Sequence, residues 1–203
     1  MMTGVARKKK SASWPVRIFG FLVLAGLIAG AWFWWDLQHW TPPEEDYPDQ
    51  GVLISQNDGT VNFKTLKALG ANFVYLESSV GNSVLDNSFV ANLAAAREAE
   101  LEVGAVHLFD PCVLADGQSA NFVTVVPREA EMMPPVIALG RTAENCEKRT
   151  SDAAVESELM TLINQIANHT GKPAILKVEP QFEAAYAISA RLERNLWVNR
   201  TRF

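Results

Sequence analysis

Three consecutive stretches, NFVYLES at 72–78, SFVANLAAAREAE at 88–100 and VGAVHLF at 103–109, decide the fold of this chain. The first and third are short runs rich in β-branched and aromatic residues, which is typical of buried strands. The second is Ala-rich and repeats its apolar residues at intervals of three or four, as an amphipathic helix does. Two strands joined through a helix predict parallel pairing, because a parallel crossover needs a long connection. The sequence therefore predicts the α/β class.

The same alternation of strand and helix patterns extends in both directions from this unit. Periodicity alone does not separate an open doubly wound sheet of six strands from a barrel. No Gly-rich phosphate loop follows the first strand to favour a nucleotide-binding fold. The further predicted strands are 52–55, 135–139, 174–178 and 196–199, and the further predicted helices are 63–69, 120–126, 152–170 and 182–192.

The composition excludes several classes of protein. Of 203 residues, 48% are apolar and 20% are charged, as in globular domains rather than disordered chains. The two cysteines and the dispersed histidines (His39, His107 and His169) have no metal-ligand spacing, so we expect no metal and no cofactor. The first 35 residues hold five of the 18 basic residues and no acid, which leaves 13 basic against 23 acidic residues in the remainder. So acidic a surface repels phosphate, and we expect no nucleic-acid partner.

The segment IFGFLVLAGLIAGAWFWW at 18–35 predicts a transmembrane helix. It carries no charge and as a helix would extend roughly 27 Å, close to the thickness of the hydrocarbon core. Basic residues precede it and acidic residues follow it, so the positive-inside rule places the N-terminus in the cytoplasm and the rest outside, periplasmic or extracellular. The predicted organisation is a cytoplasmic basic tail at 1–17, a signal anchor at 18–35, an acidic Pro-rich spacer at 36–50 and a folded domain at 51–203.

Two other interpretations of this segment remain open. Ala29-Gly30-Ala31 has the small-x-small form of a signal-peptide cleavage site, so the segment could be removed from the mature protein. It could also be a buried helix of the core. The four aromatic residues at 32–35 and the opposite charges on the two flanks favour a retained anchor over both.

Four strings stand in a fixed order in the folded part: GVLIS at 51–55, FVYLESSVG at 73–81, VGAVHLF at 103–109 and PPVIALG at 134–140. In order and content they resemble the glycoside hydrolase family 25 lysozymes, whose motifs read G-[IV]-D-[VI]-S, F-V-Y-[IL]-K-x-[ST]-E-G, V-G-A-Y-H-F-[FY] and P-P-V-L-D-V-E. This resemblance implies an incomplete TIM-like β/α barrel after the N-terminal transmembrane helix, and muramidase activity on peptidoglycan. Further strings that resemble the family are 86–101, 171–176 and 196–201.

The resemblance fails at the family's carboxylates. The Asp of the first strand is replaced by Leu53, the Glu of the second by Val80, and the Asp and Glu of the fourth by Ala138 and Gly140. Cleavage of a glycosidic bond needs one acid to protonate the leaving oxygen and a second group to stabilise or attack the anomeric centre. Neither group is present at these positions. The chain also ends where the family continues into a last strand, so the sequence leaves open whether the barrel closes.

Other acids are candidates for relocated catalysis. Glu77, Asp110 and Glu179 end the second, third and fifth predicted strands, so they would lie on the rim where barrel enzymes keep their chemistry. A rim acid is equally expected to be solvated or to cap a helix. We expect His107 to be packed and hydrogen-bonded within its strand, and Trp197 to be a core residue.

The two cysteines are expected to form a disulfide. Cys112 follows the third predicted strand and Cys146 lies in the connection after the fourth, so in a parallel barrel both hang from one face off neighbouring strands. Such loops can bring their Cα atoms within the ~4.4–6.8 Å that a disulfide requires. A location outside the cytoplasm permits the oxidation.

Three functions remain open from the sequence. The first is a membrane-anchored, lysozyme-like pseudoenzyme that faces the cell envelope and binds peptidoglycan or another envelope protein without cleaving it. The second is an active peptidoglycan muramidase that uses relocated carboxylates. The third is an envelope scaffold with no affinity for glycan.

Overall fold

The computed structural model describes residues 14–38, 43, 45–148 and 150–198, which divide into two compact units. One unit contains the N-terminal helix, and the other is the folded domain, Glu44–Asn199. The predicted basic tail up to residue 13, His39 and the spacer residues 39–42, and the end of the last predicted strand at 199 lie outside the described residues.

The N-terminal helix α1, Trp14–Gln38, includes the whole apolar segment and extends it at both ends. None of its residues is buried, which removes the support for a buried core helix. In the part of the chain that the structure describes, α1 is the one helix long and apolar enough to cross a membrane, with a mean hydropathy of 2.0. A signal sequence near an N-terminus has the same two properties.

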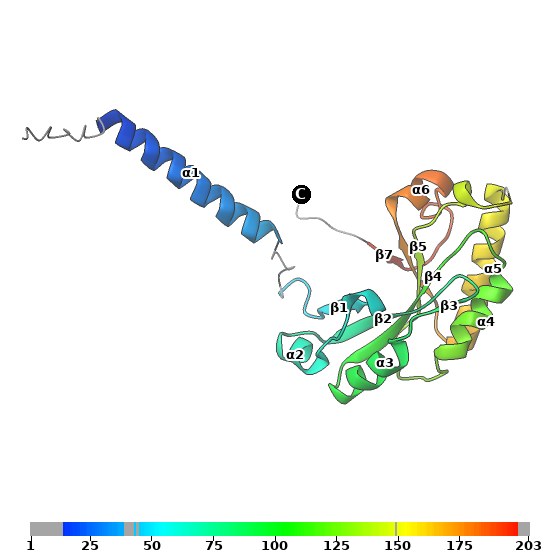
Figure 1. The fold of residues 1–203 in the computed structure, drawn as a ribbon. Helices are drawn as coiled ribbons and strands as arrows, with labels where there is room; N and C mark the ends of the chain where they lie inside the picture. The colour runs from blue at the N-terminus through cyan, green and yellow to red at the C-terminus, as the bar shows by residue number, and fades with distance from the viewer. Residues whose placement is uncertain (1–13, 39–42, 44, 149, 199–203) are drawn as a thin grey trace, which may run out of the picture. The chain divides into compact units, whose positions relative to one another are not determined.

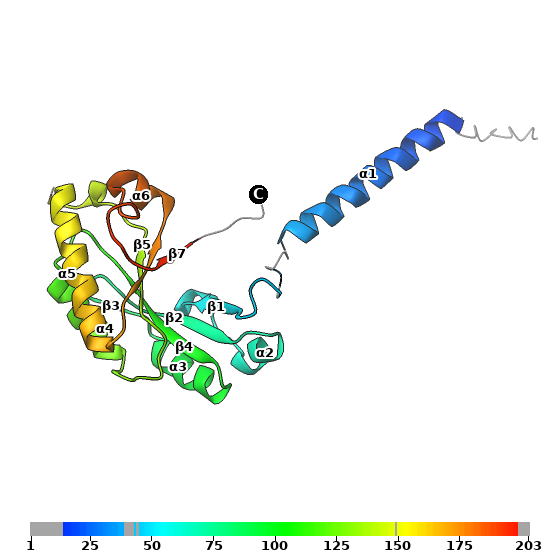
Figure 2. The same cartoon turned by 180° about the vertical axis from the view of Figure 1, so that it is seen from behind.

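The folded domain is built on one curled sheet (Figures 1 and 2). Its six main strands are all parallel and lie in the order β1-β2-β4-β5-β6-β7, which confirms the predicted α/β class. A short strand that the sequence did not predict, β3 (Val84–Leu85), returns antiparallel along the end of β2. The main strands are β1 Gly51–Ile54, β2 Phe73–Val80, β4 Glu102–Leu108, β5 Val136–Leu139, β6 Ile175–Val178 and β7 Leu196–Trp197.

Helices connect the parallel strands. Their ends follow local chemistry: Asn62 and Ser151 cap α2 and α5 by accepting hydrogen bonds from backbone N–H groups, and Gly171 ends α5 in the left-handed conformation. Two ends differ from the prediction by five residues or more: α4 begins at Ala115 instead of residue 120, and α6 stops at Tyr186 instead of residue 192. The helices are α2 Phe63–Ala68, α3 Phe89–Glu98, α4 Ala115–Val125, α5 Asp152–Thr170 and α6 Pro180–Tyr186, with the 3-10 turns η1 Gln56–Asp58 and η2 Ala143–Asn145.

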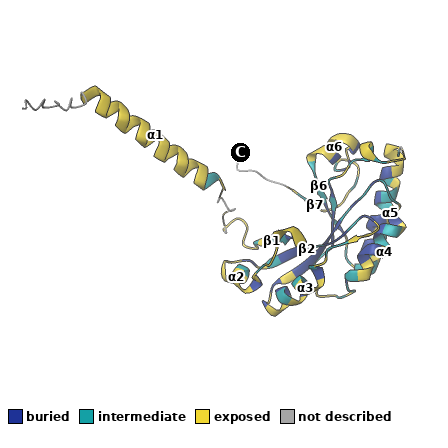
Figure 3. Ribbon diagram, viewed as in Figure 1, coloured by how far each residue is buried: buried dark blue, intermediate teal, exposed yellow. Residues whose placement is uncertain are grey.

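The main core lies between the sheet and its helices (Figure 3). A second, smaller cluster lies on the inner face of the sheet around Tyr75, Val106 and Val136, so the strands are apolar on both faces, as parallel strands usually are. Tyr75 also lies against Trp197, with 5.3 Å between the ring centroids. Three strands separate β2 from β7 in the sheet, so this contact requires a strongly curled sheet.

Gly104 makes room for the Tyr75 ring. A Cβ atom at position 104 would lie 2.2 Å from Cε1 of Tyr75, far inside contact distance. The ring therefore lies flat across the neighbouring strand, and its hydroxyl donates a hydrogen bond to the carbonyl of Pro134 over 3.1 Å. The resulting architecture is an incomplete β/α barrel whose interior is filled by side chains.

Candidate functional site

A cavity of about 350 Å³ lies at the carboxyl ends of the parallel strands, the end where β/α barrels keep their active sites. It gathers seven positions that the sequence singled out: the three candidate acids and the four positions where the family carboxylates are replaced. Its lining residues are Leu53, Glu77, Val80, Val106, Leu108, Phe109, Asp110, Ala138, Gly140, Arg141, Lys177 and Glu179.

The strand register explains why distant positions meet there. Leu108, Ala138 and Lys177 are direct partners across β4, β5 and β6, so their side chains share the inner face of the sheet. Gly140 follows at the end of β5, where an added Cβ would lie 3.5 Å from the Cγ of Glu179. A Cβ atom at position 140 would therefore contact the residue that follows β6 without a steric clash.

A β-bulge in β2 brings both Glu77 and Val80 to the cavity. Glu77 pairs with Val106 and Ser79 pairs with His107, so Ser78 is an extra residue without a partner in the ladder. Its hydroxyl donates instead to the carbonyl of Val106 over 2.9 Å. The extra residue reverses the alternation of faces, so two cavity residues lie three positions apart on one strand.

The two acids Asp110 and Glu179 are each held by a cation. Asp110 accepts the backbone N–H of Cys112 at Oδ1 over 2.9 Å, and Nη1 of Arg141 at Oδ2 over 2.6 Å. The carboxylate of Glu179 forms an ion pair with the ammonium group of Lys177. Charge-assisted hydrogen bonds of this kind are stronger than hydrogen bonds between neutral groups.

Glu77 is different, since it is half-buried and makes no hydrogen bond or ion pair with any described residue. Burial raises the pKa of its carboxyl group, and the negative charges of Asp86 and Asp58 raise it further. Lys177 acts in the opposite direction and does not cancel them. Glu77 is therefore the one acid of the cavity whose environment favours the protonated form.

Cys112 and Cys146 are joined by a disulfide, with their Cα atoms 5.2 Å apart. The bond links the loop after β4 to the segment after β5. Asp110 and Arg141 connect the same two loops a few residues closer to the strands. The cavity rim is therefore tied twice at this point, once covalently and once by an ion pair.

His107 and Trp197 lie away from the cavity lining. His107 is fully buried under α4, where its ring nitrogens contact Ser79 Oγ at 2.9 Å and Gln118 Oε1 at 3.3 Å. Burial lowers the pKa of His107 to about 4, although the hydrogen bond with Gln118 opposes the shift. Trp197 packs on Tyr75 in the inner cluster.

Sequence reasoning missed the two cations of the site. Lys177 stands two residues before Glu179, a spacing that places both side chains on one side of an extended chain, so local sequence carried a signal for this pair. Arg141 pairs with a residue 31 positions away, and only the pairing of β4 with β5 brings them together.

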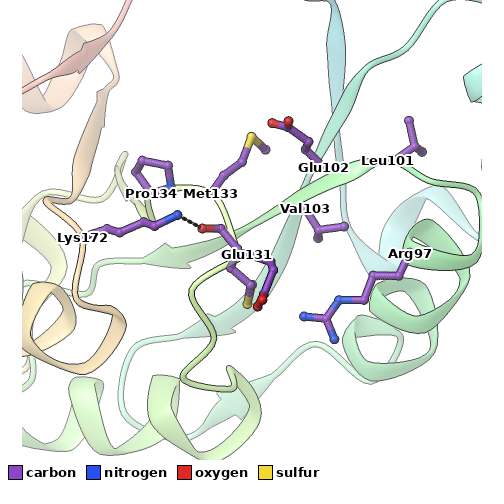
Figure 4. Close-up of a pocket in the computed structure, with 9 residues that line it drawn as sticks. Arg97, Leu101, Glu102, Val103, Glu131, Met133, Pro134 and Lys172 are labelled. Atoms are coloured by element: carbon purple, nitrogen blue, oxygen red, sulfur yellow. Dashed lines mark hydrogen bonds between the residues drawn. The ribbon is translucent and has the colours of Figure 1, made fainter.

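A second cavity, of about 520 Å³, opens at the opposite end of the strands (Figure 4). Lys172 crosses it and donates a hydrogen bond from Nζ to the carbonyl of Met132 over 2.5 Å. Arg97, also on its wall, is paired with Glu129. None of the candidate site residues lines this cavity, so the chemistry of the chain is expected at the other end.

Among the described residues, no group of three or more His, Cys, Asp and Glu side chains is arranged to hold a metal ion. Two acids of the first cavity are ion-paired with cationic side chains, and the third, Glu77, has no ion pair with a described residue. The arrangement can therefore bind charged groups.

Comparison with known proteins gives a consistent relationship. The model of the family described as glycosyl hydrolases family 25 matches residues 52–202. The fold is similar to that of a family 25 glycosyl hydrolase from Bacillus anthracis, with a TM-score of 0.68 and 24% identity over 75% of this chain and 70% of that one. It is also similar to a bacterial lysozyme from Streptomyces coelicolor, with a TM-score of 0.65 and 19% identity over 74% and 73% of the two chains.

One curated relative matches a shorter region. Lysozyme M1 of Streptomyces globisporus is 32% identical over 73 residues, which are 36% of this chain. The match spans about a quarter (25%) of the length of that relative.

Proposed function

This chain belongs to glycosyl hydrolase family 25, and from that premise we propose that its domain binds peptidoglycan in the cell envelope without cleaving it. The proposal rests on one observation. The four positions at which the family resemblance puts carboxylates hold Leu53, Val80, Ala138 and Gly140, and all four line one cavity. The cavity lies where the family has its catalytic carboxylates and lacks those carboxylates. Such a cavity can bind a ligand without cleaving it.

The remaining acids do not supply a substitute pair. Glycosidic cleavage requires a carboxyl group that can give a proton and a second, ionised one at a set separation. Asp110 and Glu179 are ion-paired with Arg141 and Lys177. Glu77 is the cavity acid whose pKa is raised, and one such acid does not make the pair.

The N-terminal segment supports a location at the membrane. In this proposal α1 is a retained anchor, residues up to 17 are cytoplasmic, residues 36–50 form a spacer, and the domain faces the envelope. The support is the uncharged segment 18–35 within α1, with basic residues before it and acidic residues after it. An anchored domain on that side of the membrane lies next to the cell wall.

An active muramidase is the second candidate. The observation in its favour is Glu77, because a carboxyl group whose pKa is raised by burial has the property required of a general acid. Its partner would have to be Asp110 or Glu179, at about 5–5.5 Å for a retaining enzyme or about 6.5–9.5 Å for an inverting one. That partner would first have to leave its ion pair.

One experiment separates these functions. Full-length protein in detergent is incubated with purified peptidoglycan between pH 4 and pH 8, and both sedimented protein and released muropeptides are measured. We expect binding without release, since general acid–base catalysis is typically worth ~10²–10⁴-fold and the family's groups are absent. Release that disappears in the Glu77→Gln or Asp110→Asn variant would identify an active enzyme instead. Absence of both binding and release would indicate a scaffold without glycan affinity.

A further inference from the structure

The side chains of the cavity at the carboxyl ends of the strands are an unusual set for a sugar site. Five of them are charged, and every other one is apolar or Gly140; none carries a neutral hydroxyl, amide or imidazole group. A pyranose presents a ring of hydroxyl groups, and each hydroxyl that leaves water needs a hydrogen-bond partner. The apolar walls supply none, and four of the five charged side chains already pair with one another, which leaves few partners for a sugar ring.

One charged side chain of the cavity is not part of an ion pair. Arg141 neutralises Asp110, and Lys177 neutralises Glu179. Glu77 is the fifth charged residue and has no hydrogen-bonded or ion-paired partner among the described residues. The net charge of the lining is therefore one negative charge, located on Glu77.

Two nearby acids add to this negative potential, and the charge of Lys177, which is ion-paired with Glu179, opposes it without cancelling it. Asp86 accepts the backbone N–H groups of Gln56 and Ser88, over 2.7 and 2.8 Å, and Asp58 accepts the N–H of Ser55 over 2.7 Å. Both acids are fixed by the backbone and have no cationic partner in the described part of the chain. A half-buried carboxylate that faces two further carboxylates lacks a cation, because charges withdrawn from water are normally paired.

We propose that this cavity binds a primary ammonium group carried on an aliphatic chain, with the carboxylate of Glu77 as the partner of the ammonium group. Leu53, Val80 and Leu108 contact the aliphatic part. The volume, about 350 Å³, is at the small end of ligand pockets and admits a side chain of this length. As far as the source of the ligand is concerned, the inference rests on the proposed function: the ammonium group is that of a diamino-acid side chain in the peptide part of peptidoglycan.

The first test uses small probes on the full-length protein in detergent. Nα-acetyl-lysine amide carries the ammonium group, and Nα-acetyl-norleucine amide has a similar aliphatic chain without it. We expect calorimetric titration to show at least tenfold weaker binding of the norleucine probe. The Glu77→Gln variant should weaken binding of the lysine probe by about 10- to 100-fold, as the loss of a charge-assisted hydrogen bond does.

Two further variants keep this test decisive. Glu102→Gln removes an acid from the cavity at the opposite end of the strands and should bind the lysine probe unchanged. Glu77→Lys places an ammonium group inside the first cavity and should abolish binding, whether or not the Gln variant folds. Equal affinity for the two probes, or a loss of binding in Glu102→Gln instead of the Glu77 variants, would overturn the proposal.

The second test identifies the source of the ammonium group. Sedimentation of the protein with peptidoglycan is compared before and after acetylation of the free amines of the polymer. A drop of at least tenfold in affinity supports the inference. Unchanged binding would overturn it and leave the proposed function standing. Binding of the lysine probe without any binding of peptidoglycan would support the ammonium site and contradict the proposed peptidoglycan ligand.

Discussion

Ser79 Oγ lies 2.9 Å from His107 Nδ1, and the hydrogen bonds of Gln118 determine which of the two atoms donates. The Gln118 amide nitrogen donates to the carbonyls of Asp110 and Val113, so its Oε1 is the acceptor that faces His107 Nε2. His107 therefore donates from Nε2 and accepts at Nδ1, and Ser79 is the donor. A neutral imidazole satisfies every partner, and a second proton on the ring, at Nδ1, would reverse the direction of the Ser79 hydrogen bond.

This network predicts a pH dependence of stability. The pKa of His107 is lowered to about 4 in the fold, against 6.5 in the unfolded chain, so the unfolded state binds the additional proton between these values. The free energy of unfolding should fall as the pH decreases from about 6.5 to about 4, by up to about 3 kcal/mol, and should be independent of this group above pH 7. Urea denaturation across that range measures it.

Two variants isolate the contribution of His107. In His107→Gln the decrease over this pH range should be clearly smaller than in the natural protein. Ser79→Ala should be less stable at every pH, by about 1–3 kcal/mol, and keep the decrease, since the buried imidazole remains. An unaltered pH profile in His107→Gln would show that other groups cause the dependence.

Removal of the disulfide should destabilise the domain. The double variant Cys112→Ala/Cys146→Ala opens a loop whose ends are 34 residues apart, which on the chain-entropy model costs about 3–4 kcal/mol. Arg141→Ala removes the parallel ion pair, and because the Arg141 side chain is 54% exposed we expect a loss below ~1 kcal/mol. Thermal unfolding under oxidising conditions compares the two, and similar losses would contradict the ranking.

The contact between Gly104 and Tyr75 predicts a steric conflict on substitution. Gly104→Ala would put a methyl group against the Tyr75 ring and should cost about 1–3 kcal/mol of stability. The cost should be the same in a Tyr75→Phe background, which keeps the ring, and smaller in a Tyr75→Leu background. Denaturation of the six combinations, Gly or Ala at position 104 with Tyr, Phe or Leu at position 75, measures this coupling. Strict additivity with Tyr75→Leu would place the cause elsewhere.

Partial restoration of the family's acids should not restore activity. In Ala138→Asp/Gly140→Glu, the new side chains have space beside Glu179 and the domain should stay folded, yet Leu53 still leaves the acid of the first strand absent. We expect no released muropeptides. The matched triple variant, which adds Leu53→Asp, shows whether that third acid is the missing one. Activity in the double variant would contradict this division of roles.

The N-terminal helix predicts retention in the membrane. Carbonate-washed membranes should keep the full-length chain, and protease added from the envelope side should degrade the domain, because basic residues hold the N-terminus in the cytoplasm. N-terminal sequencing of the mature protein provides the control. A mature N-terminus at Trp32 would identify a cleaved signal peptide.

The sequence predicted the main elements of the fold because their patterns are local. All six predicted parallel strands are present, and α5 has the predicted bounds, since Ser151 caps its start and Gly171 ends it. The antiparallel strand β3 was missed because two residues carry no period. The predicted helix over 182–192 is shorter because Ala187 adopts a positive φ of 49°, a conformation that nothing in an Ala-containing run signals.

The position of the candidate site could be predicted from the sequence, and the pairing of its charged side chains could not. Strand ends placed Glu77, Asp110 and Glu179 at one rim, and the structure brings all three to one cavity. Which acid lacks a partner depends on contacts across strands, such as the one between Asp110 and Arg141. Such contacts follow from sheet register and side-chain reach, which no local pattern encodes.

The extra residue at Ser78 has a consequence for how the length of this strand can vary among related chains. Removal of Ser78 would leave Glu77 opposite Val106 and Ser79 opposite His107, so a relative with a regular strand presents the same faces with one residue fewer. If the two sequences were aligned without a gap, Val80 would be aligned with a residue whose side chain faces the helices. A single-residue gap at 78 keeps cavity positions opposite cavity positions.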